Sequence, residues 1–245
     1  MTSAELGVAR VGDVAVWTIA REARRNALTP GLLGALAAAV RAAPDEGVRA
    51  AVLTGAGDVA FSAGYDLAAL EAEGHGAAER ALGDAARALS EAPFPIVAAL
   101  NGACVGGGLE LALRCDVRVA HGGVALKMPP ARLGIVYATE GLARLAAIAG
   151  ESRARRMFLF AEPAPAEAAL GWGLIDELVP AAGVLPRALA RATEAAALAP
   201  LAVAGMRFAF EALLASRAAL PPATAGELDA RRAAAWAHRP IPKAP

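Results

Sequence analysis

The sequence has few cysteines, few aromatic side chains and no net charge. Its 245 residues include two cysteines and 4% aromatic residues, with 24 basic side chains against 24 acidic ones. Cys104 and Cys115 are too few and wrongly spaced for a disulfide framework, a CxxC redox pair or a zinc ribbon, so we expect reduced thiols. The balanced charge and the lack of a Lys/Arg cluster argue against a nucleic-acid partner.

Long apolar runs are also missing. The longest apolar stretch, residues 195–206, contains Pro200 and is shorter than the ~20 residues that a membrane span requires. The first five residues have neither the basic segment nor the apolar segment of a signal peptide. We therefore expect a cytoplasmic protein with no membrane partner, long enough to build a core without disulfides or metals.

The apolar periodicity predicts an α/β fold. Thr29 and Pro30 are typical of a helix start, and an apolar stripe follows them as far as Pro44. This helix lies between predicted strands, an order that favours α/β architecture. Strands are predicted over 14–19, 48–54, 96–100 and 115–120. Further helices are predicted over 109–113, 140–149, 151–160, 164–170, 185–198, 200–216 and 225–237.

The predicted strands concentrate in the first half of the chain and the helices in the second. We expect one α/β core over residues 1–190 and a C-terminal helical extension over residues 191–245, rather than two independent domains. Residues 71–76 contain two glycines, which lower the cost of disorder, and they predict a mobile surface loop.

The most informative segment is residues 101–116, NGACVGGGLELALRCD. Its three glycines stand where a strand passes into a helix, and they allow positive φ and the close approach of a ligand. The N–H groups at such a helix start can hold a phosphate or a developing oxyanion. A tight turn packed against a neighbouring strand explains the glycines equally well. The phosphate motifs of NTPases and dinucleotide-binding enzymes are absent.

Glu110 lies in the first turn of that helix. Its carboxylate is either a helix-end charge, worth ~0.3–1 kcal/mol, or an acid/base group that faces the ligand held at Gly107. The spacing does not separate these readings. A second small-residue turn, AFSAGYDL over residues 60–67, follows the 48–54 strand. Ser62 has no Gly-x-Ser-x-Gly context, so a nucleophile elbow is not indicated, and Asp66 is a candidate N-cap.

Together, the segments FSAGYDL and NGACVGGGLELALRCD resemble the crotonase (enoyl-CoA hydratase/isomerase) superfamily. The resemblance covers about residues 10–215, with supporting stretches at 24–28, 150–154 and 164–176. It implies a spiral of ββα units whose C-terminal helices support a homotrimer or a dimer of trimers. It also implies an acyl-coenzyme A thioester as ligand, and no metal or cofactor beyond the coenzyme A of the substrate.

The resemblance assigns roles to particular residues. It places an oxyanion hole at the N–H groups of Tyr65 and Gly107, where one donor is typically worth ~2.7–4 kcal/mol of transition-state stabilisation. It makes Glu110 the acid/base group. Arg24 or Arg25 either pairs with a coenzyme A phosphate or is a solvated surface charge. The positions that match the substrate-binding and coenzyme A-binding stretches are Ala23, Arg24, Arg25, Ala63, Asp66, Leu67, Gly106 and Pro130.

The sequence departs from the hydratase pattern at Pro130, which stands where hydratases of this family have a second glutamate. Proline neither donates nor accepts a proton, so we expect weak hydration of simple enoyl-CoA esters. Tyr137 resembles a tyrosine of methylmalonyl-CoA decarboxylase-like members, and its alternative is core packing. Glu140 either replaces the missing carboxylate or is a solvent-facing helix start.

These departures leave three functions open. The first is an enoyl-CoA hydratase/isomerase-type lyase or isomerase with Glu110 as its acid/base group. The second is a methylmalonyl-CoA-type decarboxylase that uses Tyr137. The third is an acyl-CoA-binding protein that has kept the oxyanion hole and lost efficient catalysis.

Overall fold

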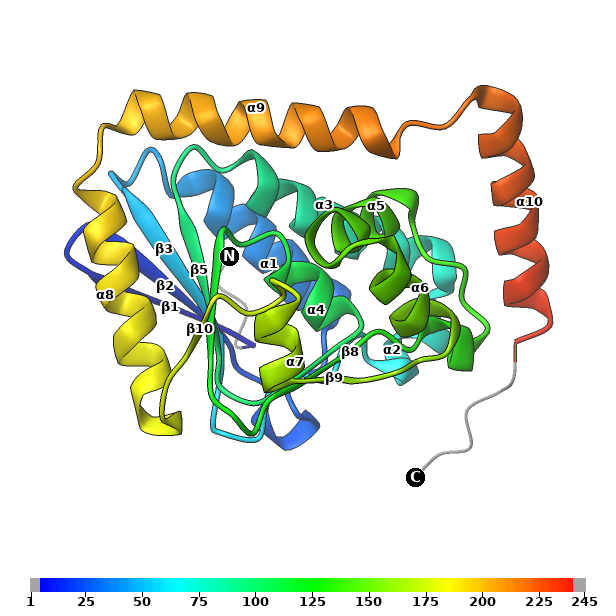
Figure 1. The fold of residues 1–245 in the computed structure, drawn as a ribbon, viewed down its shortest axis with the longest axis horizontal. Helices are drawn as coiled ribbons and strands as arrows, with labels where there is room; N and C mark the ends of the chain where they lie inside the picture. The colour runs from blue at the N-terminus through cyan, green and yellow to red at the C-terminus, as the bar shows by residue number, and fades with distance from the viewer. Residues whose placement is uncertain (1–4, 240–245) are drawn as a thin grey trace.

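Two β-sheets with helices around them form the frame of the molecule (Figure 1). The computed structural model describes residues 5–239; residues 1–4, most of the segment without signal-peptide features, and the tail 240–245 lie outside the described residues. The six-stranded sheet contains, in spatial order, β1 (Leu6–Val11), β2 (Val14–Ile19), β3 (Ala50–Gly55), β5 (Ile96–Leu100), β7 (Val117–Ala120) and β10 (Glu177–Leu178). The four-stranded sheet contains β4 (Ala60–Ser62), β6 (Ala103–Val105), β8 (Ala125–Lys127) and β9 (Ala164–Pro165).

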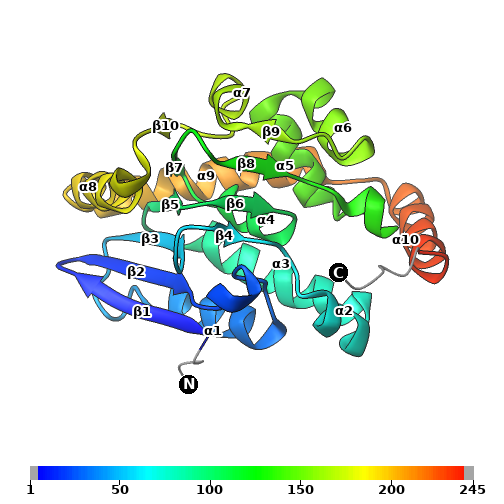
Figure 2. The same ribbon diagram turned by 90° about the horizontal axis from the view of Figure 1, so that it is seen from below.

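From β3 to β8, successive strands of the chain alternate between the two sheets. The pairs β3 and β4, β5 and β6, and β7 and β8 each place one strand in each sheet. Neighbours from β2 to β10 are parallel in the larger sheet, while β1 and β2 form an antiparallel hairpin. Because parallel strands need long crossover connections, helices separate these pairs along the chain. The ββα spiral expected from the resemblance is confirmed, and Figure 2 shows its turns one above another.

Ten α-helices and three short 3₁₀ helices connect and cover the strands of the described chain. The predicted start of the first α-helix is confirmed, because Thr29 Oγ1 accepts the Leu32 N–H at 3.2 Å and Pro30 is the first helical residue. The α-helices are α1 (Pro30–Ala42), α2 (Leu67–Glu73), α3 (His75–Glu91), α4 (Gly107–Ala112), α5 (Thr139–Ala149), α6 (Glu151–Leu159), α7 (Ala166–Gly171), α8 (Val184–Ala196), α9 (Pro200–Ala218) and α10 (Pro222–Ala237). The 3₁₀ helices are η1 (Glu22–Arg24), η2 (Pro130–Leu133) and η3 (Ala181–Gly183).

The larger sheet is buried on both faces. Side chains alternate along a strand, so Leu53 enters the main core, which also contains Trp17 and Leu36 of α1. Its neighbour Val52 points to the opposite face and joins a second cluster with Val184 at the start of α8. Because parallel sheets require cover on both faces, α8 completes the core. The boundary that we expect at residues 190/191 falls inside α8, and α9 and α10 form the helical part that follows.

The predicted surface loop at residues 71–76 is wrong. This stretch is a junction between helices: α2 ends at Glu73, Gly74 adopts φ 78°, and α3 begins at His75. Glycine favours this left-handed conformation at a helix end, while the surrounding alanines and leucines favour helix. The helix α3, the strand β1 and the short strands of the four-stranded sheet were not predicted from the sequence. Residues 164–165, predicted as helix, pair with β8 as β9.

Two observations bear on the C-terminal helices. Among the described residues, no single helix has both the length and the apolar character to cross a bilayer, and the segments Ala181–Ala196 and Pro200–Ala218 meet both criteria only as a pair bent by 110°. Arg207 of α9 is buried and donates to the carbonyl oxygens of Ala92 at 2.8 Å and Leu89 at 2.7 Å, and it also pairs with the Asp116 carboxylate. This one side chain therefore attaches α9 to the end of α3 and to the residue that precedes β7.

We expect Arg207→Met to destabilise the fold. Removal of one partner of a buried ion pair costs ~3–5 kcal/mol, but Asp116 keeps part of its side chain in water, so the expected loss is about 2–3 kcal/mol. Chemical denaturation monitored by circular dichroism measures it. Arg217→Met, an exposed position on the same helix, is the control, and equal stability of the two variants contradicts the anchoring role of Arg207.

Candidate active site

A cavity of about 670 Å³ lies between α3, the start of α4, the segment from η2 to the start of α5, and α9. Most of the residues predicted from the sequence line this one cavity: Tyr65, Gly107, Glu110, Tyr137, Glu140, Ala63, Leu67, Gly106 and Pro130. Ala23, Arg24, Arg25 and Asp66 are outside its lining. Residues of α3, such as Leu82 and Ser90, form one wall of the cavity, and they were not predicted from the sequence.

Two backbone segments meet at one side of the cavity because glycine stands in each. Gly64 adopts φ 94°, and a Cβ atom there would lie 2.9 Å from the Val105 carbonyl oxygen and 3.6 Å from the Gly107 nitrogen. Only a residue without a side chain fits this gap. Gly107 is the first residue of α4, so its N–H has no acceptor within the helix. Tyr65 follows Gly64 directly, and the turns that carry Tyr65 and Gly107 therefore lie side by side.

Glu110 is held at the cavity by a neighbouring arginine. It lies in α4, is only 5% exposed, and accepts hydrogen bonds on Oε1 from Arg114 Nε, at 3.0 Å, and from Arg114 Nη2. Its other oxygen, Oε2, accepts no hydrogen bond from the described residues. The sequence reading missed Arg114, although the i,i+4 spacing of the two charges is a recognisable signal.

Tyr137 is partly buried, and its hydroxyl lies buried beside Glu110. Its ring packs against Phe158 with 5.2 Å between ring centroids, and its hydroxyl has no hydrogen-bond partner among the described residues. Burial raises the pKa of Tyr137 well above its ordinary value, and the nearby negative charge of Glu110 raises it further, so the phenol stays protonated. Tyr137 therefore packs against the core and also lines the cavity, and its catalytic role stays a prediction.

Gly141 makes this arrangement possible. A Cβ atom on Gly141 would lie 2.7 Å from Glu110 Oε2 and 2.5 Å from Tyr137 Cε1, so the backbone of α5 touches both groups. This glycine was not predicted as a site residue. It could have been suspected because glycine lowers helix stability, so a glycine in the first turn of a helix indicates close packing at that position.

Pro130 and Glu140 both line the cavity, but Pro130 is buried and Glu140 is exposed. Pro130 is buried in η2 and lines the cavity. Glu140 also lines the cavity, but its side chain is exposed in the first turn of α5, where Thr139 Oγ1 donates to it at 3.3 Å. Glu140 is thus a solvent-facing residue at the start of α5 that also lines the cavity, and its replacement of the missing carboxylate stays a prediction.

The residues around η1 lie beside the cavity rather than in its lining. Ala63 donates its N–H to the Arg25 carbonyl at 2.9 Å, which brings η1 against the cavity-lining turn. The side chains of Arg24 and Arg25 are exposed. Asp66 serves as N-cap of α2, accepting from the Ala68 N–H at 3.0 Å and the Ala69 N–H at 3.3 Å. Among the side chains that the structure describes, no group of three or more His, Cys, Asp or Glu is arranged to hold a metal ion.

Comparison with known proteins gives consistent matches. Residues 10–232 match a family model described as enoyl-CoA hydratase/isomerase. The probable enoyl-CoA hydratase echA6 of Mycobacterium tuberculosis is 37% identical over 198 residues, which are 81% of this chain and 79% of that protein. A solved enoyl-CoA hydratase from Bacillus anthracis has a TM-score of 0.80 and 26% identity, covering 96% of this chain and 91% of that one.

A solved methylmalonyl-CoA decarboxylase, in complex with 2-nitronate-propionyl-CoA, has a TM-score of 0.89 and covers 97% of this chain and 92% of its own. Its sequence identity to this chain is 23%, and at that level the similarity shows the fold alone.

We expect Gly141→Ala to lower stability although alanine is the better helix former. The clash with Glu110 and Tyr137 costs ~1–3 kcal/mol by overpacking, more than the ~0.5–1 kcal/mol gained in helix propensity. Gly34→Ala in α1, where a Cβ meets nothing within 4 Å, is the matched control and should stabilise the protein. Thermal unfolding of both variants measures the difference, and a stabilised Gly141→Ala would show that α5 does not press on the two side chains.

Proposed function

This chain belongs to the enoyl-CoA hydratase/isomerase family, and from that premise we propose that it performs enolate chemistry on an acyl-CoA thioester with Glu110 as the proton-transfer group. One observation carries the proposal. Glu110 Oε2 and the Tyr137 hydroxyl are buried polar atoms that make no hydrogen bond of normal geometry with the described residues, the two groups interact with each other, and both residues line the same cavity. Such atoms are costly to leave unpaired, so a bound polar ligand is the natural partner for them.

The thioester carbonyl belongs between the N–H groups of Tyr65 and Gly107 in this proposal. When Glu110 takes a proton from the α-carbon, the C–H electron pair moves towards the carbonyl oxygen and an enolate forms. Two fixed N–H donors stabilise that oxygen without reorganisation. The close approach of Gly64 to Gly107, and the position of Gly107 at the start of α4, support this assignment.

The coenzyme A part of the substrate is assigned to the rim of the cavity. Contact between Ala63 and the Arg25 carbonyl supports a channel along η1, with Arg24 or Arg25 near a phosphate. The residues assigned to this channel and to the acyl subsite remain Ala23, Arg24, Arg25, Ala63, Asp66, Leu67, Gly106 and Pro130.

The proposal requires no cofactor beyond the coenzyme A of the substrate. Cys104 and Cys115, buried and unbridged, support the predicted cytoplasmic location.

Efficient hydration of simple enoyl-CoA esters is not part of the proposal. Hydration needs a second proton-transfer group on the far side of the water, and Pro130 has no titratable side chain. Glu140 is the carboxylate that the sequence offers as a replacement, but its side chain is exposed and no described contact joins it to Glu110. An isomerase or a lyase that works with one carboxylate agrees better with this site.

Decarboxylation of a methylmalonyl-type CoA is a second candidate, favoured by the protonated phenol of Tyr137. In that reaction the bond between the α-carbon and the carboxylate carbon breaks and CO₂ leaves. The electron pair of that bond stays with the acyl group and forms the enolate. The enolate carbon then takes one proton. The Tyr137 hydroxyl is buried beside Glu110 and keeps its proton, so it is suited to donate there or to orient the acid that does.

Glu110→Gln tests the proposal directly. We expect the purified protein to turn over at least one ester in a mass-spectrometric screen of enoyl-, 3-hydroxyacyl- and malonyl-type CoA compounds. Loss of a general acid/base group should lower that turnover about 10²-fold or more in Glu110→Gln. Glu151→Gln on the exposed face of α6 is the control and should leave it unchanged.

The outcomes of the screen separate the candidates. Turnover of methylmalonyl-CoA that falls in Tyr137→Phe identifies the decarboxylase. Turnover unchanged in Glu110→Gln contradicts the proposal. Rapid hydration of crotonyl-CoA contradicts the interpretation of Pro130. Stabilisation by acyl-CoA esters without turnover of any of them identifies the binding protein instead.

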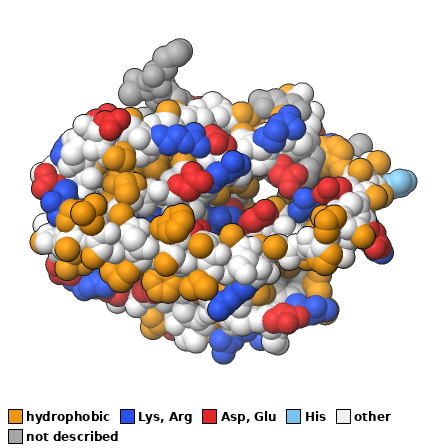
Figure 3. Space-filling model, turned by 90° about the horizontal axis from the view of Figure 1, so that it is seen from above, with side chains coloured by type: hydrophobic (Ala, Val, Ile, Leu, Met, Phe, Trp, Pro, Cys, Tyr) orange, Lys and Arg blue, Asp and Glu red, His pale blue; other side chains and the backbone are white. Residues whose placement is uncertain are grey.

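The proposal includes a homotrimer or a dimer of trimers. The solvent-facing surface of α9 carries large apolar side chains that are exposed among the described residues, and Figure 3 looks onto the side that α9 crosses. Exposed apolar surface of this kind marks association sites. Its large exposed members are Leu201, Met206, Phe208, Phe210 and Leu213.

We expect the double variant Leu201→Glu, Phe210→Glu to dissociate the assembly, because it places two charges on that apolar face. Light scattering coupled to size exclusion measures the mass. Val11→Glu, at the exposed end of β1, is the control. A parent protein that elutes as a monomer contradicts the oligomer.

A further inference from the structure

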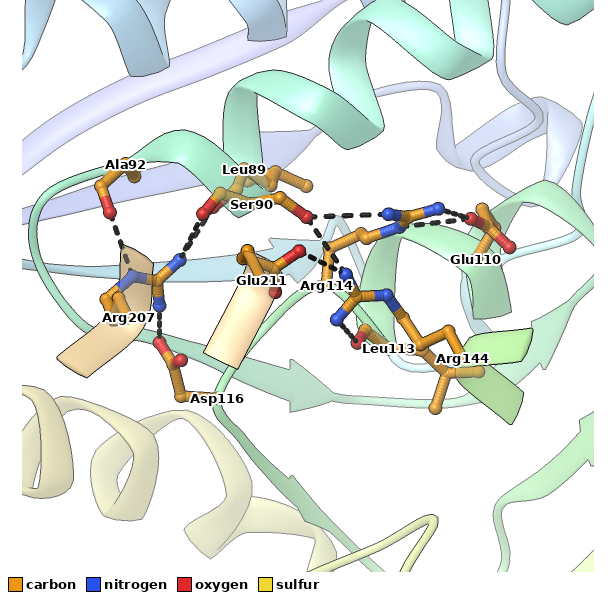
Figure 4. Close-up of polar contacts among 10 residues, drawn as sticks. All are labelled: Leu89, Ser90, Ala92, Glu110, Leu113, Arg114, Asp116, Arg144, Arg207 and Glu211. Carbon is orange, nitrogen blue, oxygen red and sulfur yellow. Dashed lines mark hydrogen bonds and ion pairs between the residues drawn. The ribbon is translucent and has the colours of Figure 1, made fainter. Parts of the chain in front are cut away.

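The orientation of the Glu110 carboxylate depends on one residue that the proposed mechanism does not use. Arg114, one helical turn further along the chain, directs both Nε and Nη2 at the same oxygen, Oε1 (Figure 4). The two side chains are 11% and 6% exposed. Because both donors are on Oε1, Oε2 is left without a hydrogen bond from the described residues, buried beside the backbone of Gly141.

Arg114 is itself held from behind. Its remaining nitrogen, Nη1, donates to Ser90 Oγ of α3 at 3.5 Å. The same oxygen accepts from Arg144 Nη2 of α5 at 3.2 Å, and Arg144 pairs with Glu211 of α9. Figure 4 shows this line of side chains, which runs from Glu110 to Glu211. Two carboxylates at the ends balance two guanidinium groups in the middle, so the line is neutral although it is largely buried.

A role confined to helix stability does not account for this geometry. Within residues 5–239, two other Glu–Arg ion pairs have the same i,i+4 spacing, Glu151–Arg155 and Glu227–Arg231. Both are exposed, where such pairs contribute little. The Glu110–Arg114 pair instead lines the cavity, where a buried carboxylate without a counter-ion is costly. Arg114 is also fixed by its hydrogen bond to Ser90.

We propose that Arg114, anchored by Ser90, is the positioning residue of Glu110: it fixes the carboxylate so that Oε2 faces the reacting carbon. This inference rests on the function proposed above. The step that it serves is the transfer of an α-proton to Oε2, with the C–H electron pair passing to the thioester as an enolate. A displacement of about 1 Å in a catalytic group can lower a rate about 10²-fold.

Exchange of the α-protons of butyryl-CoA in D₂O, followed by mass spectrometry, tests the proposal on the full-length protein. We expect Arg114→Met to lower the maximal exchange rate about 10²-fold while KM changes less than about threefold, because the substrate is still bound. Arg114→Lys keeps the charge but lacks the two-nitrogen fork, and it should recover part of the rate. Ser90→Ala should lower the rate by a smaller factor, also without a change in KM.

Arg155→Met is the matched control, since it removes an arginine with the same spacing from an exposed pair, and it should exchange at the parental rate. Thermal unfolding checks that each variant is folded at the assay temperature. If Arg114→Met does not fold, the comparison of Arg114→Lys with the parent decides the question.

Two results overturn the proposal alone: parental exchange in a folded Arg114→Met or, where that variant does not fold, in Arg114→Lys, or a loss that lies wholly in KM. In either case Glu110→Gln still abolishes exchange, and the proposed function stands. Exchange that persists in Glu110→Gln, or that is absent from the parent, overturns the proposed function together with this inference.

Discussion

Close backbone contact between successive turns of the spiral is the constraint on which the site depends. At the corners where the chain passes from one sheet to the other, glycine is the residue that fits. A Cβ atom at Gly55 would lie 2.5 Å from the Phe61 carbonyl oxygen, and one at Gly102 would lie 2.4 Å from the backbone of Val59. Gly64 has the same role against Val105. Because these turns stack without intervening side chains, the segments that carry Tyr65 and Gly107 become neighbours.

The second constraint is the burial of charge. A chain without net charge still places arginines deep in the structure, and the described contacts pair each of the main ones with a carboxylate or with backbone carbonyls. Arg207 attaches α9, Arg118 pairs with Asp176 at the end of the larger sheet, and Arg114 holds Glu110. Buried ions of this kind contribute less to stability than to a single defined arrangement, because each is costly when its partner is removed. In the cavity, that arrangement decides which atom meets the ligand.

Much of the framework was predictable because its signals are local. The helix start at Thr29 and Pro30, the apolar strands and the glycine-rich junction before α4 follow from patterns within a few residues. The strands β4, β6 and β8 were missed because three residues carry too little periodicity, and they are stabilised by pairing with one another across distant parts of the chain. The helix α3 was not predicted because a glycine between two helices has the same sequence signature as a glycine in a loop. Gly74 is the C-cap of α2 and the N-cap of α3.

The sequence by itself determined the family pattern, the glycines at the corners, the presence of Glu110 and the presence of a proline at position 130. These properties depend on residue identity at fixed spacing, which the chain carries whatever its fold. Tertiary structure alone decided that α3 and α9 enclose the cavity and that Gly141 brings α5 against Glu110 and Tyr137. It also decided that Arg114 donates to Oε1 of Glu110 and leaves Oε2 without a hydrogen bond from the described residues. Such relations join residues that are far apart in the sequence, and only packing of the whole chain sets the distances between them.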